Sequence, residues 1–340
     1  MRTILIAAAL AAHPATVPQA PPPAPPKLAV ILVVDQMRAD YVDRFKGGWT
    51  GGLKRMIDEG AWFTNTAYPY LTTVTCAGHA TISTGSFPRT HGIFQNAWWD
   101  RESRKQVSCT EDPRPEAADV GYGEPVQGGD SARWLQVPTF ADQMRAERQA
   151  HVATVALKDR SAIMLAGHGG DAVTWMGAST DGWITSKVFS TAPVPVVERF
   201  IADHRMSADL GKVWTRLLPE ARYKTPDDAV GEAPPKGWTR TFPHFLNGAS
   251  NTADAEFFAH WERSPYADAL VGRFAAALVE GLQLGSHDGT DVLAVSFSTP
   301  DLVGHAFGPR SQEIQDIYAQ LDRTIGTLFD RLDALVGRDR

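Results

Sequence analysis

Long apolar runs bounded by polar residues recur along the chain, at residues 28–34, 152–157 and 291–297. Continuous apolar runs, unlike alternating ones, are typical of parallel strands that are buried on both faces of a sheet. The first run therefore predicts a central parallel strand. A helical pattern follows over residues 51–57, and residues 61–64 predict a second strand.

Apolar residues with helical spacing mark three further segments, at residues 139–145, 266–282 and 314–336. The alternation of strands with helices predicts an α/β fold. This alternation is lost over residues 183–286, where strand-like pieces mix with proline-rich turns, and we interpret that stretch as an inserted cap subdomain. Residues 100–130 are charged, glycine-rich and weakly periodic, which predicts a long surface excursion.

The N-terminus has one basic residue and a short apolar run, which is the pattern of a secretory signal peptide. We predict such a peptide over residues 1–20 and a proline-rich spacer over residues 18–26. The apolar run is too short to span a bilayer, and no later stretch is long and apolar enough for a membrane helix. The expected location is therefore periplasmic or secreted.

The 340 residues are 43% hydrophobic, which is enough for a sizeable core. The net charge of −6 gives no reason to expect a nucleic acid as a partner. The two cysteines, Cys76 and Cys109, can form a disulfide in an oxidising compartment or remain two separate thiols. The sequence leaves both alternatives open, and it does not indicate an oligomeric state.

A stretch rich in small residues, 71–85, lies between two turns and places Thr75 where a helix can begin. The free N–H groups and the dipole of a helix N-terminus favour an anion such as phosphate. A hydroxyl at that position can attack a bound phosphoryl group, provided that its pKa is lowered. The alternative is that Thr75 is only an N-cap, which is the commoner role of a threonine at a helix start.

Polar residues directly follow two of the predicted strands. Asp35 comes after the first strand, where open α/β sheets place ligands, and it is either a metal ligand or a helix cap. Lys158 and Arg160 come after the strand at 152–157, and alternate residues there can point in the same direction. Both cations can then neutralise a phosphate dianion, while the alternative is an ordinary solvated charge cluster.

Asp301 and His305 follow the strand at 291–297 and are four residues apart, so one helical turn puts both on one side. A carboxylate with an imidazole is a common zinc pair, and the position after a predicted strand strengthens this interpretation. Other histidines lack the spacing of metal ligands and are interpreted as structural or surface residues: His204, His244, His260 and His287.

In their order along the chain, these motifs together resemble the alkaline phosphatase superfamily: Asp35, the stretch 75–85, Asn96, Lys158-x-Arg160 and the segment 299–305 with its Asp301 and His305. The closer resemblance is to bacterial periplasmic alkaline phosphatases with a threonine nucleophile, which are related to type I phosphodiesterases and nucleotide pyrophosphatases. The resemblance covers residues 28–340. It implies a three-layer α/β/α fold with a mostly parallel central sheet and an inserted cap subdomain.

The resemblance implies two zinc ions and their ligands. Thr75 would be both the nucleophile and a ligand of one ion, which Asp35 would also bind, and Asp301 and His305 would bind the other. Two metal ions about 4 Å apart can stabilise the attacking and leaving oxygens of an in-line displacement. The implied reaction is the hydrolysis of small phosphate monoesters through a phosphothreonine intermediate.

The resemblance also implies how phosphate would be held. Asn96 would donate a hydrogen bond to one phosphoryl oxygen, and Lys158 and Arg160 would hold the others. In the family, this Lys-x-Arg pair accompanies a preference for monoesters. Three further residues match no role and are interpreted as structural: Asn65, His79 and His91.

The sequence departs from the family at its C-terminal end. Family members take further zinc ligands from later segments, an Asp–His pair and a histidine, whereas this chain ends soon after the helix predicted at 314–336. We therefore expect residues 27–340 to form an alkaline-phosphatase-like catalytic domain without its C-terminal part. Both zinc sites would be incomplete in such a fragment, so we expect weak zinc binding and little activity from the 340-residue chain.

Three functional hypotheses result. The first is a zinc-dependent alkaline phosphatase that acts on monoesters. The second is a phosphodiesterase or nucleotide pyrophosphatase with the same fold. The third is a metal-deficient fragment that only binds phosphate.

Overall fold

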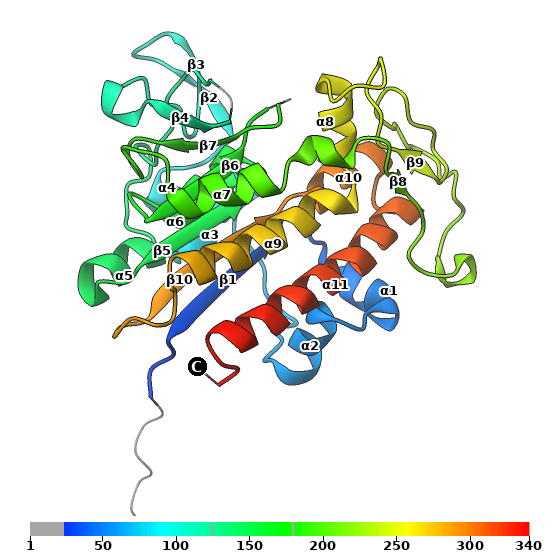
Figure 1. Ribbon diagram of the computed structural model, residues 1–340, viewed down its shortest axis with the longest axis horizontal. Coiled ribbons are helices and arrows are strands. Elements are labelled where there is room, and N and C mark those ends of the chain that lie inside the picture. Colours follow the sequence, from blue (N-terminus) through cyan, green and yellow to red (C-terminus); the bar gives the residue numbers. More distant parts are fainter. Residues whose placement is uncertain (1–23, 124, 179, 340) are drawn as a thin grey trace, which may run out of the picture.

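Six strands form the central sheet of the computed structural model, which describes residues 24–123, 125–178 and 180–339. In sheet order they are β1 (Leu28–Val34), β10 (Asp291–Phe297), β5 (Val152–Ala156), β6 (Ala172–Met176), β7 (Trp183–Ser186) and β4 (Asp119–Tyr122). The first four are parallel to one another, whereas β7 pairs antiparallel with both β6 and β4. The predicted α/β fold with a mostly parallel central sheet is confirmed (Figure 1).

The three predicted apolar strands are present as β1, β5 and β10, but the prediction that β1 is central is wrong. Within the part of the chain that the structure describes, β1 lies at the end of the sheet and pairs only with β10. It is half-buried, and Val30 is 36% exposed. An apolar run indicates that a strand is covered, but it does not indicate what covers it. The centre is instead occupied by β10 and β5, in which every residue is buried.

Different helices cover the two faces of the sheet (Figure 1). Successive side chains of β5 point to opposite faces, so Ala153 and Val155 join one hydrophobic core and Ala156 joins another. The first core contains residues of α1 (Ala39–Phe45), α2 (Gly52–Glu59), α7 (Pro195–Asp203), α9 (Pro265–Gly281) and α11 (Gln312–Leu335). On the other face lie α3 (Thr75–Thr84), α5 (Phe140–Arg148) and α6 (Asp159–Ala166). The result is the three-layer arrangement that the resemblance implied.

Two predictions about connecting segments need correction. Residues 61–64 form no strand, and lie in a coil in which Phe63 is 79% exposed. The surface excursion predicted over residues 100–130 is only partly present, because it contains β4, which joins the central sheet through β7. The partner of β4 is distant in sequence, and a local pattern does not reveal such a pairing.

Shorter elements complete the fold: α4 (Pro88–His91), β2 (Ala97–Asp100), β3 (Lys105–Ser108), β8 (Val213–Trp214), β9 (His244–Phe245), α8 (Ala255–Trp261), α10 (Thr299–Phe307) and the 3-10 turns Lys46–Gly48, Pro115–Ala117, Met206–Asp209 and Glu220–Arg222. The segment 183–286 begins with β7 in the sheet and includes α9, which packs on β10 and β5. Between them, β8, β9 and α8 lie together to one side (Figure 1). The cap subdomain remains a prediction.

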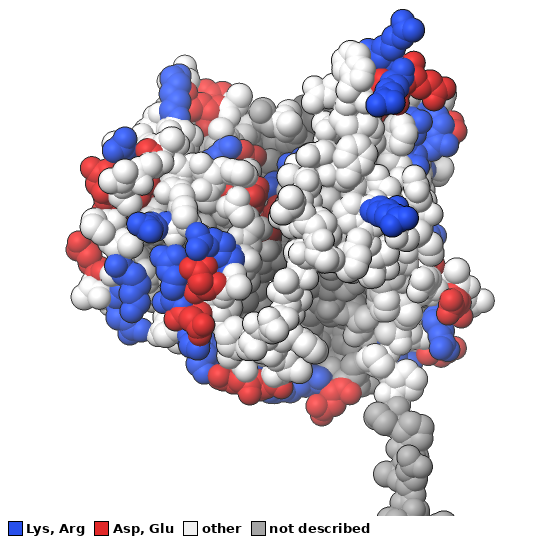
Figure 2. All heavy atoms as spheres, turned by 180° about the vertical axis from the view of Figure 1, so that it is seen from behind, with Lys and Arg blue, Asp and Glu red and all other residues white. Residues whose placement is uncertain are grey.

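The helices of the described part of the chain include none that is long and apolar enough to cross a bilayer. The predicted signal peptide lies outside the described residues, as does most of the proline-rich spacer. On the face shown in Figure 2, Lys and Arg side chains lie among Asp and Glu side chains. This mixture agrees with the modest net charge of −6.

Candidate active site

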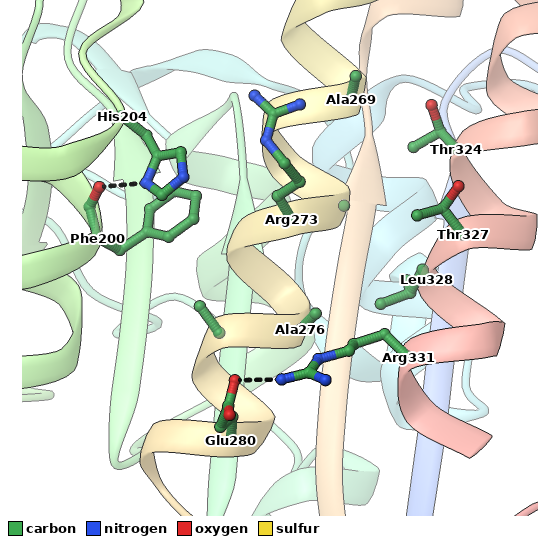
Figure 3. Close-up of a pocket in the computed structure, with 12 residues that line it drawn as sticks. Phe200, His204, Ala269, Arg273, Ala276, Glu280, Thr324, Thr327, Leu328 and Arg331 are labelled. Carbon is green, nitrogen blue, oxygen red and sulfur yellow. Dashed lines mark hydrogen bonds and ion pairs between the residues drawn. The ribbon is translucent and has the colours of Figure 1, made fainter. Parts of the chain in front are cut away.

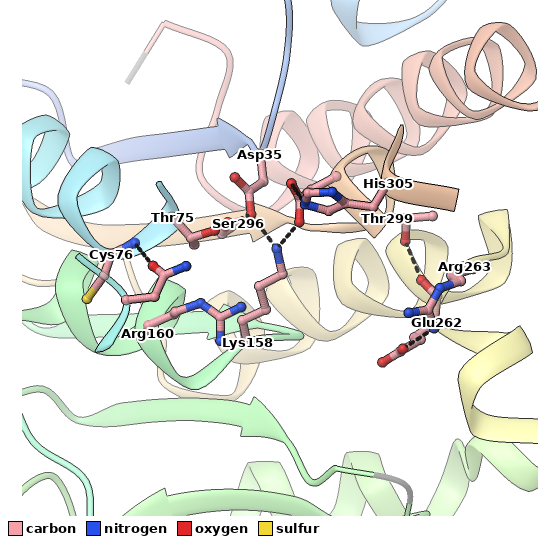
Figure 4. Close-up of polar contacts among 12 residues, drawn as sticks. Asp35, Thr75, Cys76, Lys158, Arg160, Glu262, Arg263, Ser296, Thr299 and His305 are labelled. Atoms are coloured by element: carbon pink, nitrogen blue, oxygen red, sulfur yellow. Dashed lines mark hydrogen bonds and ion pairs between the residues drawn. The ribbon is translucent and has the colours of Figure 1, made fainter. Parts of the chain in front are cut away.

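Three neighbouring strands carry polar residues at their carboxyl ends. Asp35 follows β1, Lys158 follows β5, and Asp301 lies in the first turn of α10, shortly after β10. Because β1, β10 and β5 are parallel and adjacent, their ends meet at one edge of the sheet. The three side chains converge there, as Figure 4 shows for Asp35 and Lys158.

Lys158 joins two carboxylates of this edge. Its Nζ lies 2.6 Å from Asp35 Oδ2 and 2.5 Å from Asp301 Oδ2, and only 8% of its side chain is exposed. Burial disfavours the charged form of Asp35, but Lys158, with smaller effects of His79 and Thr75, outweighs burial and leaves the pKa of the Asp35 carboxyl below its ordinary value. The Lys158 side chain therefore faces the site and is not part of a solvated charge cluster.

Thr75 is the first helical residue of α3, and the residue in the N-cap position is Val74. The alternative that Thr75 is an N-cap is therefore wrong. Its hydroxyl instead donates to Asp35 Oδ2 across a distance of 3.2 Å. The side chain is thus held between a helix N-terminus, which favours anions, and a carboxylate.

Asn96 is oriented by the main chain of α3. The Cys76 N–H donates to Asn96 Oδ1 at 2.9 Å, so the side-chain NH₂ group remains as the donor of this amide. The Cys109 N–H also donates to the Asn96 backbone oxygen at 2.9 Å. Cys76 and Cys109 form a disulfide, which settles the alternative that the sequence left open and joins the start of α3 to the segment that follows β3.

Arg160 lies in the first turn of α6, two residues after Lys158, and its guanidinium group points into the same region (Figure 4). One of its nitrogens donates to Asp159 Oδ1 at 3.2 Å. Its buried Nε has no hydrogen-bond partner among the described residues. A buried donor without a partner costs free energy, which an acceptor in the site would recover.

His305 lies one turn after Asp301 in α10, and its Nε2 is 3.2 Å from Asp301 Oδ1. The predicted side-by-side placement of these two residues is present. The imidazole is mostly exposed and lines a hollow of about 320 Å³, which Arg263, Leu302 and Ala306 also line. This hollow opens the site toward the region of α8.

His79 was interpreted as structural, but the structure places it directly beneath Thr75. Its Nδ1 is 2.8 Å from the Thr75 backbone oxygen, and its Nε2 is 2.8 Å from Ser296 Oγ on β10. Because a carbonyl oxygen can only accept, Nδ1 carries the proton. Burial lowers the pKa of His79, which agrees with a neutral ring. The spacing of four residues from Thr75 in a predicted helix could have indicated this contact.

A second polar group borders the site at the joint between α8 and α9 (Figure 4). Thr299 Oγ1 donates to the Glu262 backbone oxygen at 3.3 Å, and Glu262 forms an ion pair with Arg263. Asp268 of α9 is buried, and its Oδ1 accepts from the Thr299 N–H at 3.4 Å. Burial raises the pKa of Asp268 to about 7. No sequence motif predicts this group, because its members come from separate segments.

The predicted zinc ligands have donor atoms that suit a metal ion. Asp35, Thr75, Asp301 and His305 are linked by the contacts above, and their oxygen and nitrogen donors are types that zinc accepts in proteins. The Lys158 ammonium lies between the two carboxylates, which shows that this pair favours a cation. Among the described residues, however, no group of three or more His, Cys, Asp or Glu side chains is arranged to hold a metal ion. The donor chemistry fits, and a complete metal centre is not formed by these residues.

A pocket of about 440 Å³ lies between α9 and α11 and is separate from this site (Figure 3). Arg273 and Arg331 line it, together with Phe200 and His204 at the end of α7. The predicted catalytic and metal-binding residues are not among its lining residues. The pocket is therefore not part of the candidate site.

Comparison with known proteins places these residues in context. The sequence model of the family described as type I phosphodiesterase / nucleotide pyrophosphatase matches residues 29–339. Alkaline phosphatase PhoV of Synechococcus elongatus is 34% identical over 318 residues, which are 92% of this chain and 56% of PhoV. Alkaline phosphatase PafA of Elizabethkingia meningoseptica is 36% identical over 318 residues, 92% of this chain and 57% of PafA. The chain thus spans somewhat more than half the length of these curated relatives.

Solved structures agree with the sequence comparison. The crystal structure of wild-type alkaline phosphatase PafA superposes with a TM-score of 0.82 at 36% identity, over 92% of this chain and 60% of the PafA chain. A PafA variant superposes with a TM-score of 0.83 at 34% identity, over the same shares of the two chains. In that variant a threonine is replaced by serine, and an asparagine, a lysine and an arginine are replaced by alanine.

Proposed function

The chain belongs to the type I phosphodiesterase / nucleotide pyrophosphatase family, and from this premise we propose that it hydrolyses phosphate monoesters with Thr75 as the nucleophile. The observation that carries the proposal is the contact between the Thr75 hydroxyl and Asp35 at the N-terminus of α3. The helix N-terminus favours a phosphate group, and the carboxylate orients the hydroxyl that would attack it. The alkaline phosphatases among the relatives support the monoester as the substrate class.

The PafA variant supports the choice of four site residues. Its substituted threonine, asparagine, lysine and arginine have the same spacing along that chain as Thr75, Asn96, Lys158 and Arg160 have along this one. We infer that the Asn96 amide and the Arg160 guanidinium donate hydrogen bonds to the phosphoryl oxygens. Lys158 adds positive charge next to them. Such donors, fixed before the substrate arrives, stabilise the charge of a phosphoryl group in transfer.

The reaction proceeds in two displacements. Thr75 Oγ attacks phosphorus, the bond between phosphorus and the ester oxygen breaks, and the leaving group departs with that oxygen and gains a proton. The product of this step is phosphothreonine at position 75. A water molecule then attacks phosphorus, the bond to Thr75 Oγ breaks, and inorganic phosphate leaves. Asn96, Lys158 and Arg160 hold the phosphoryl oxygens in both steps.

Divalent metal ions, which we propose to be zinc, would be held by Asp35, Thr75, Asp301 and His305. When bound, they supply the positive charge that makes a threonine hydroxyl reactive near neutral pH. His79 holds the backbone of Thr75. The Asp35 and Asp301 carboxylates hold the Lys158 ammonium in the structure, and metal ions bound to the same carboxylates would leave Lys158 to the phosphoryl oxygens. These contacts fix the nucleophile relative to the residues that would bind phosphate.

A second candidate function is the hydrolysis of phosphate diesters, which the description of the family favours. The Lys158–Arg160 pair disfavours diester hydrolysis, because two cations match the two negative charges of a phosphate monoester better than the single charge of a diester. A third candidate is a protein that binds phosphate without hydrolysing its esters.

Export to the periplasm or medium is supported by the Cys76–Cys109 disulfide, since such bonds persist in oxidising compartments.

The test is the capture of the phosphoryl group on the protein. The chain is incubated with zinc and an aryl phosphate monoester or diester, quenched in acid and digested, and the peptide that contains Thr75 is analysed by mass spectrometry. We expect slow phosphorylation at Thr75 with the monoester, in the wild type but not in Thr75→Ala, because the described residues do not form a complete metal centre. Serine should serve in place of threonine, so Thr75→Ser is the control that retains labelling.

Other outcomes separate the candidates. Faster labelling and turnover with the diester would reject the monoester proposal in favour of diester hydrolysis. Binding of inorganic phosphate without labelling or turnover of either ester would leave only the phosphate-binding function. Turnover that survives in Thr75→Ala would reject Thr75 as the nucleophile.

A further inference from the structure

Two histidines lie side by side at the end of the sheet opposite to the candidate active site. His151 precedes β5, and His287 lies in the loop before β10. Their rings are stacked with centroids 3.9 Å apart and planes 26° apart. The site described above lies at the carboxyl ends of these strands, so the histidine pair belongs to a different part of the molecule.

A carboxylate holds each ring through the same nitrogen. His151 Nδ1 lies 3.2 Å from Asp171 Oδ1, and His287 Nδ1 lies 2.6 Å from Asp291 Oδ2. Both carboxylates are themselves fixed by backbone N–H groups. Asp171 accepts from Val152 at 2.7 Å, and the fully buried Asp291 accepts from His151 at 2.9 Å.

These contacts determine which nitrogen of each ring is free. A carboxylate accepts hydrogen bonds, so Nδ1 of each histidine carries the proton and the neutral ring has its lone pair on Nε2. Neither Nε2 takes part in a hydrogen bond within the described part of the chain, and the side chains are 43% exposed for His151 and 33% exposed for His287. Two oriented lone pairs therefore remain accessible from solvent.

We propose that His151 and His287 together bind one divalent transition-metal ion through their Nε2 atoms. Imidazole nitrogen suits zinc, nickel and copper, with bond lengths of about 2 Å, so two ligand nitrogens of one ion lie about 3 Å apart. The rings are stacked with centroids 3.9 Å apart, a separation that allows their Nε2 atoms to approach this range. Water would supply the other ligands.

The carboxylates make this pair different from two ordinary surface histidines. A histidine that binds a metal almost always donates its other N–H to a carboxylate or carbonyl, which fixes the ring and raises its basicity as a ligand. Both rings have such a carboxylate here. The ion would join the start of β5 to the loop before β10, and it would stabilise the fold because it binds only where both segments are in place.

The test is a titration with Cu²⁺, the divalent ion that nitrogen sites bind most tightly. It is followed by electron paramagnetic resonance, which counts the nitrogens bound to the ion. The titration is done in a His305→Ala background, because that substitution removes the imidazole of the candidate active site. We expect a signal with two bound imidazole nitrogens, and an affinity at least about tenfold lower after His151→Ala or His287→Ala.

His168 provides a matched control. It is also a partly exposed histidine with Nδ1 on a carboxylate, that of Asp142, but its Nε2 lies 3.2 Å from the Leu135 backbone oxygen and is not free. His168→Ala should leave Cu²⁺ affinity unchanged. Asp171→Asn keeps both rings and weakens the hold on one, so it should lower the affinity by about 10-fold to 100-fold.

Two results would overturn the proposal. One is an unchanged two-nitrogen signal in a variant with both His151→Ala and His287→Ala. The other is a loss of Cu²⁺ affinity in His168→Ala as large as that in His151→Ala. Thermal unfolding without metal identifies any variant that does not fold. If a histidine variant does not fold, Asp171→Asn decides: an unchanged Cu²⁺ affinity in that variant would also reject His151 and His287 as an oriented site.

Discussion

At the scale of single residues, the charge of Lys158 is the central feature of the site. Its ammonium is the cation that Asp35 and Asp301 now share, and all three side chains are largely buried. Removing one member of a buried ion group leaves the others uncompensated and costs about 3 to 5 kcal/mol. A divalent ion that binds to the same carboxylates would compete with Lys158 for them.

We therefore predict opposite effects of Lys158→Ala on stability and on zinc binding. Without metal, the variant should unfold at a lower temperature, because two buried carboxylates lose their counter-charge. With zinc, it should bind the ion at least about tenfold more tightly, which corresponds to about 1.4 kcal/mol. Calorimetric unfolding and zinc titration measure the two effects. Arg160→Ala is the control, since Arg160 contacts neither carboxylate of the pair, and equal zinc affinities in the two variants would contradict the competition.

His79 permits a second prediction at this scale. His79→Leu removes the N–H that holds the Thr75 backbone and should lower kcat about tenfold, with KM nearly unchanged, because a loss of about 1.4 kcal/mol in the transition state has that effect. In His79→Asn the side-chain amide can still donate to that oxygen, so part of kcat should return. A KM that rises while kcat stays constant in His79→Leu would show that His79 does not position the nucleophile.

At the scale of elements, the start of α2 lies in close contact with α11. A Cβ atom added to Gly52 would lie 2.4 Å from Ile325 Cγ2 and 2.6 Å from the Gly326 nitrogen. Asp322 of α11 accepts hydrogen bonds from the backbone N–H groups of Gly51 and Lys54, and so caps α2 from another helix. The helix positions therefore depend on a glycine at 52.

We predict that Gly52→Ala lowers the free energy of unfolding by about 1 to 3 kcal/mol, because the added methyl group forces α2 away from α11. The measurement is denaturant unfolding of the variant beside the wild type. Gly47→Ala is the matched control, since no atom lies within 4 Å of a Cβ added there. If both variants lose the same free energy, the close approach of α2 to α11 is not the cause.

The elements also show what the sequence could and could not predict. Apolar runs located β1, β5 and β10, and helical spacing located α5 and α11, because burial of a whole strand or one helix face leaves a local pattern. The order of strands leaves no such pattern, so β1 was predicted to be central although it lies at the edge. The aromatic residues of 61–64 suggested a strand, yet they lie in an exposed coil.

The candidate site was likewise predictable only where its residues leave a local pattern in the sequence. Asp35, Lys158 and Asp301 could be found because each comes soon after a predicted strand, and strands of a parallel sheet end at one edge. Their actual contacts depend on β10 lying between β1 and β5, which the sequence alone did not establish. The group of Glu262, Thr299 and Asp268 was not found, because its members come from separate segments. The contact of His79 with Ser296 joins distant segments in the same way, whereas its contact with Thr75, four residues earlier, was within reach of the helical spacing.

At the scale of the whole molecule, stability depends on pH through buried acids. Glu313 of α11 and His244 of β9 are both fully buried, with His244 Nε2 2.9 Å from Glu313 Oε1. Burial raises the pKa of Glu313 to about 8 and lowers the pKa of His244 to about 4. The folded protein therefore keeps Glu313 protonated at pH values at which the unfolded chain has released that proton.

We predict that Glu313 makes the free energy of unfolding fall as pH rises from about 4.5 to about 8, an effect that the lowered pKa of His244 opposes below about pH 6.5. Glu313 ionises near 4.5 in the unfolded chain and near 8 in the folded one, so unfolding releases a proton in this range. One such group contributes at most about 1.4 kcal/mol per pH unit. Glu313→Gln cannot ionise, so the difference between stabilities at pH 5 and pH 8 should shrink in that variant.

Denaturant unfolding at the two pH values measures this difference. Glu280→Gln is the control, because Glu280 is exposed on α9 and should leave the pH dependence as it is in the wild type. A Glu313→Gln variant with the wild-type pH dependence would show that Glu313 is already ionised in the folded protein.

The disulfide between Cys76 and Cys109 makes the order of the candidate site depend on oxidation. It links the helix that carries Thr75 to the segment that holds Asn96, and it forms only after the chain has met an oxidant. A newly made copy in a reducing cytosol would hold these two segments by weak contacts alone. If the protein is exported and acts as proposed, the two segments would become fully ordered only outside the cytosol, and the phosphate esters of the cell's own metabolism would be spared.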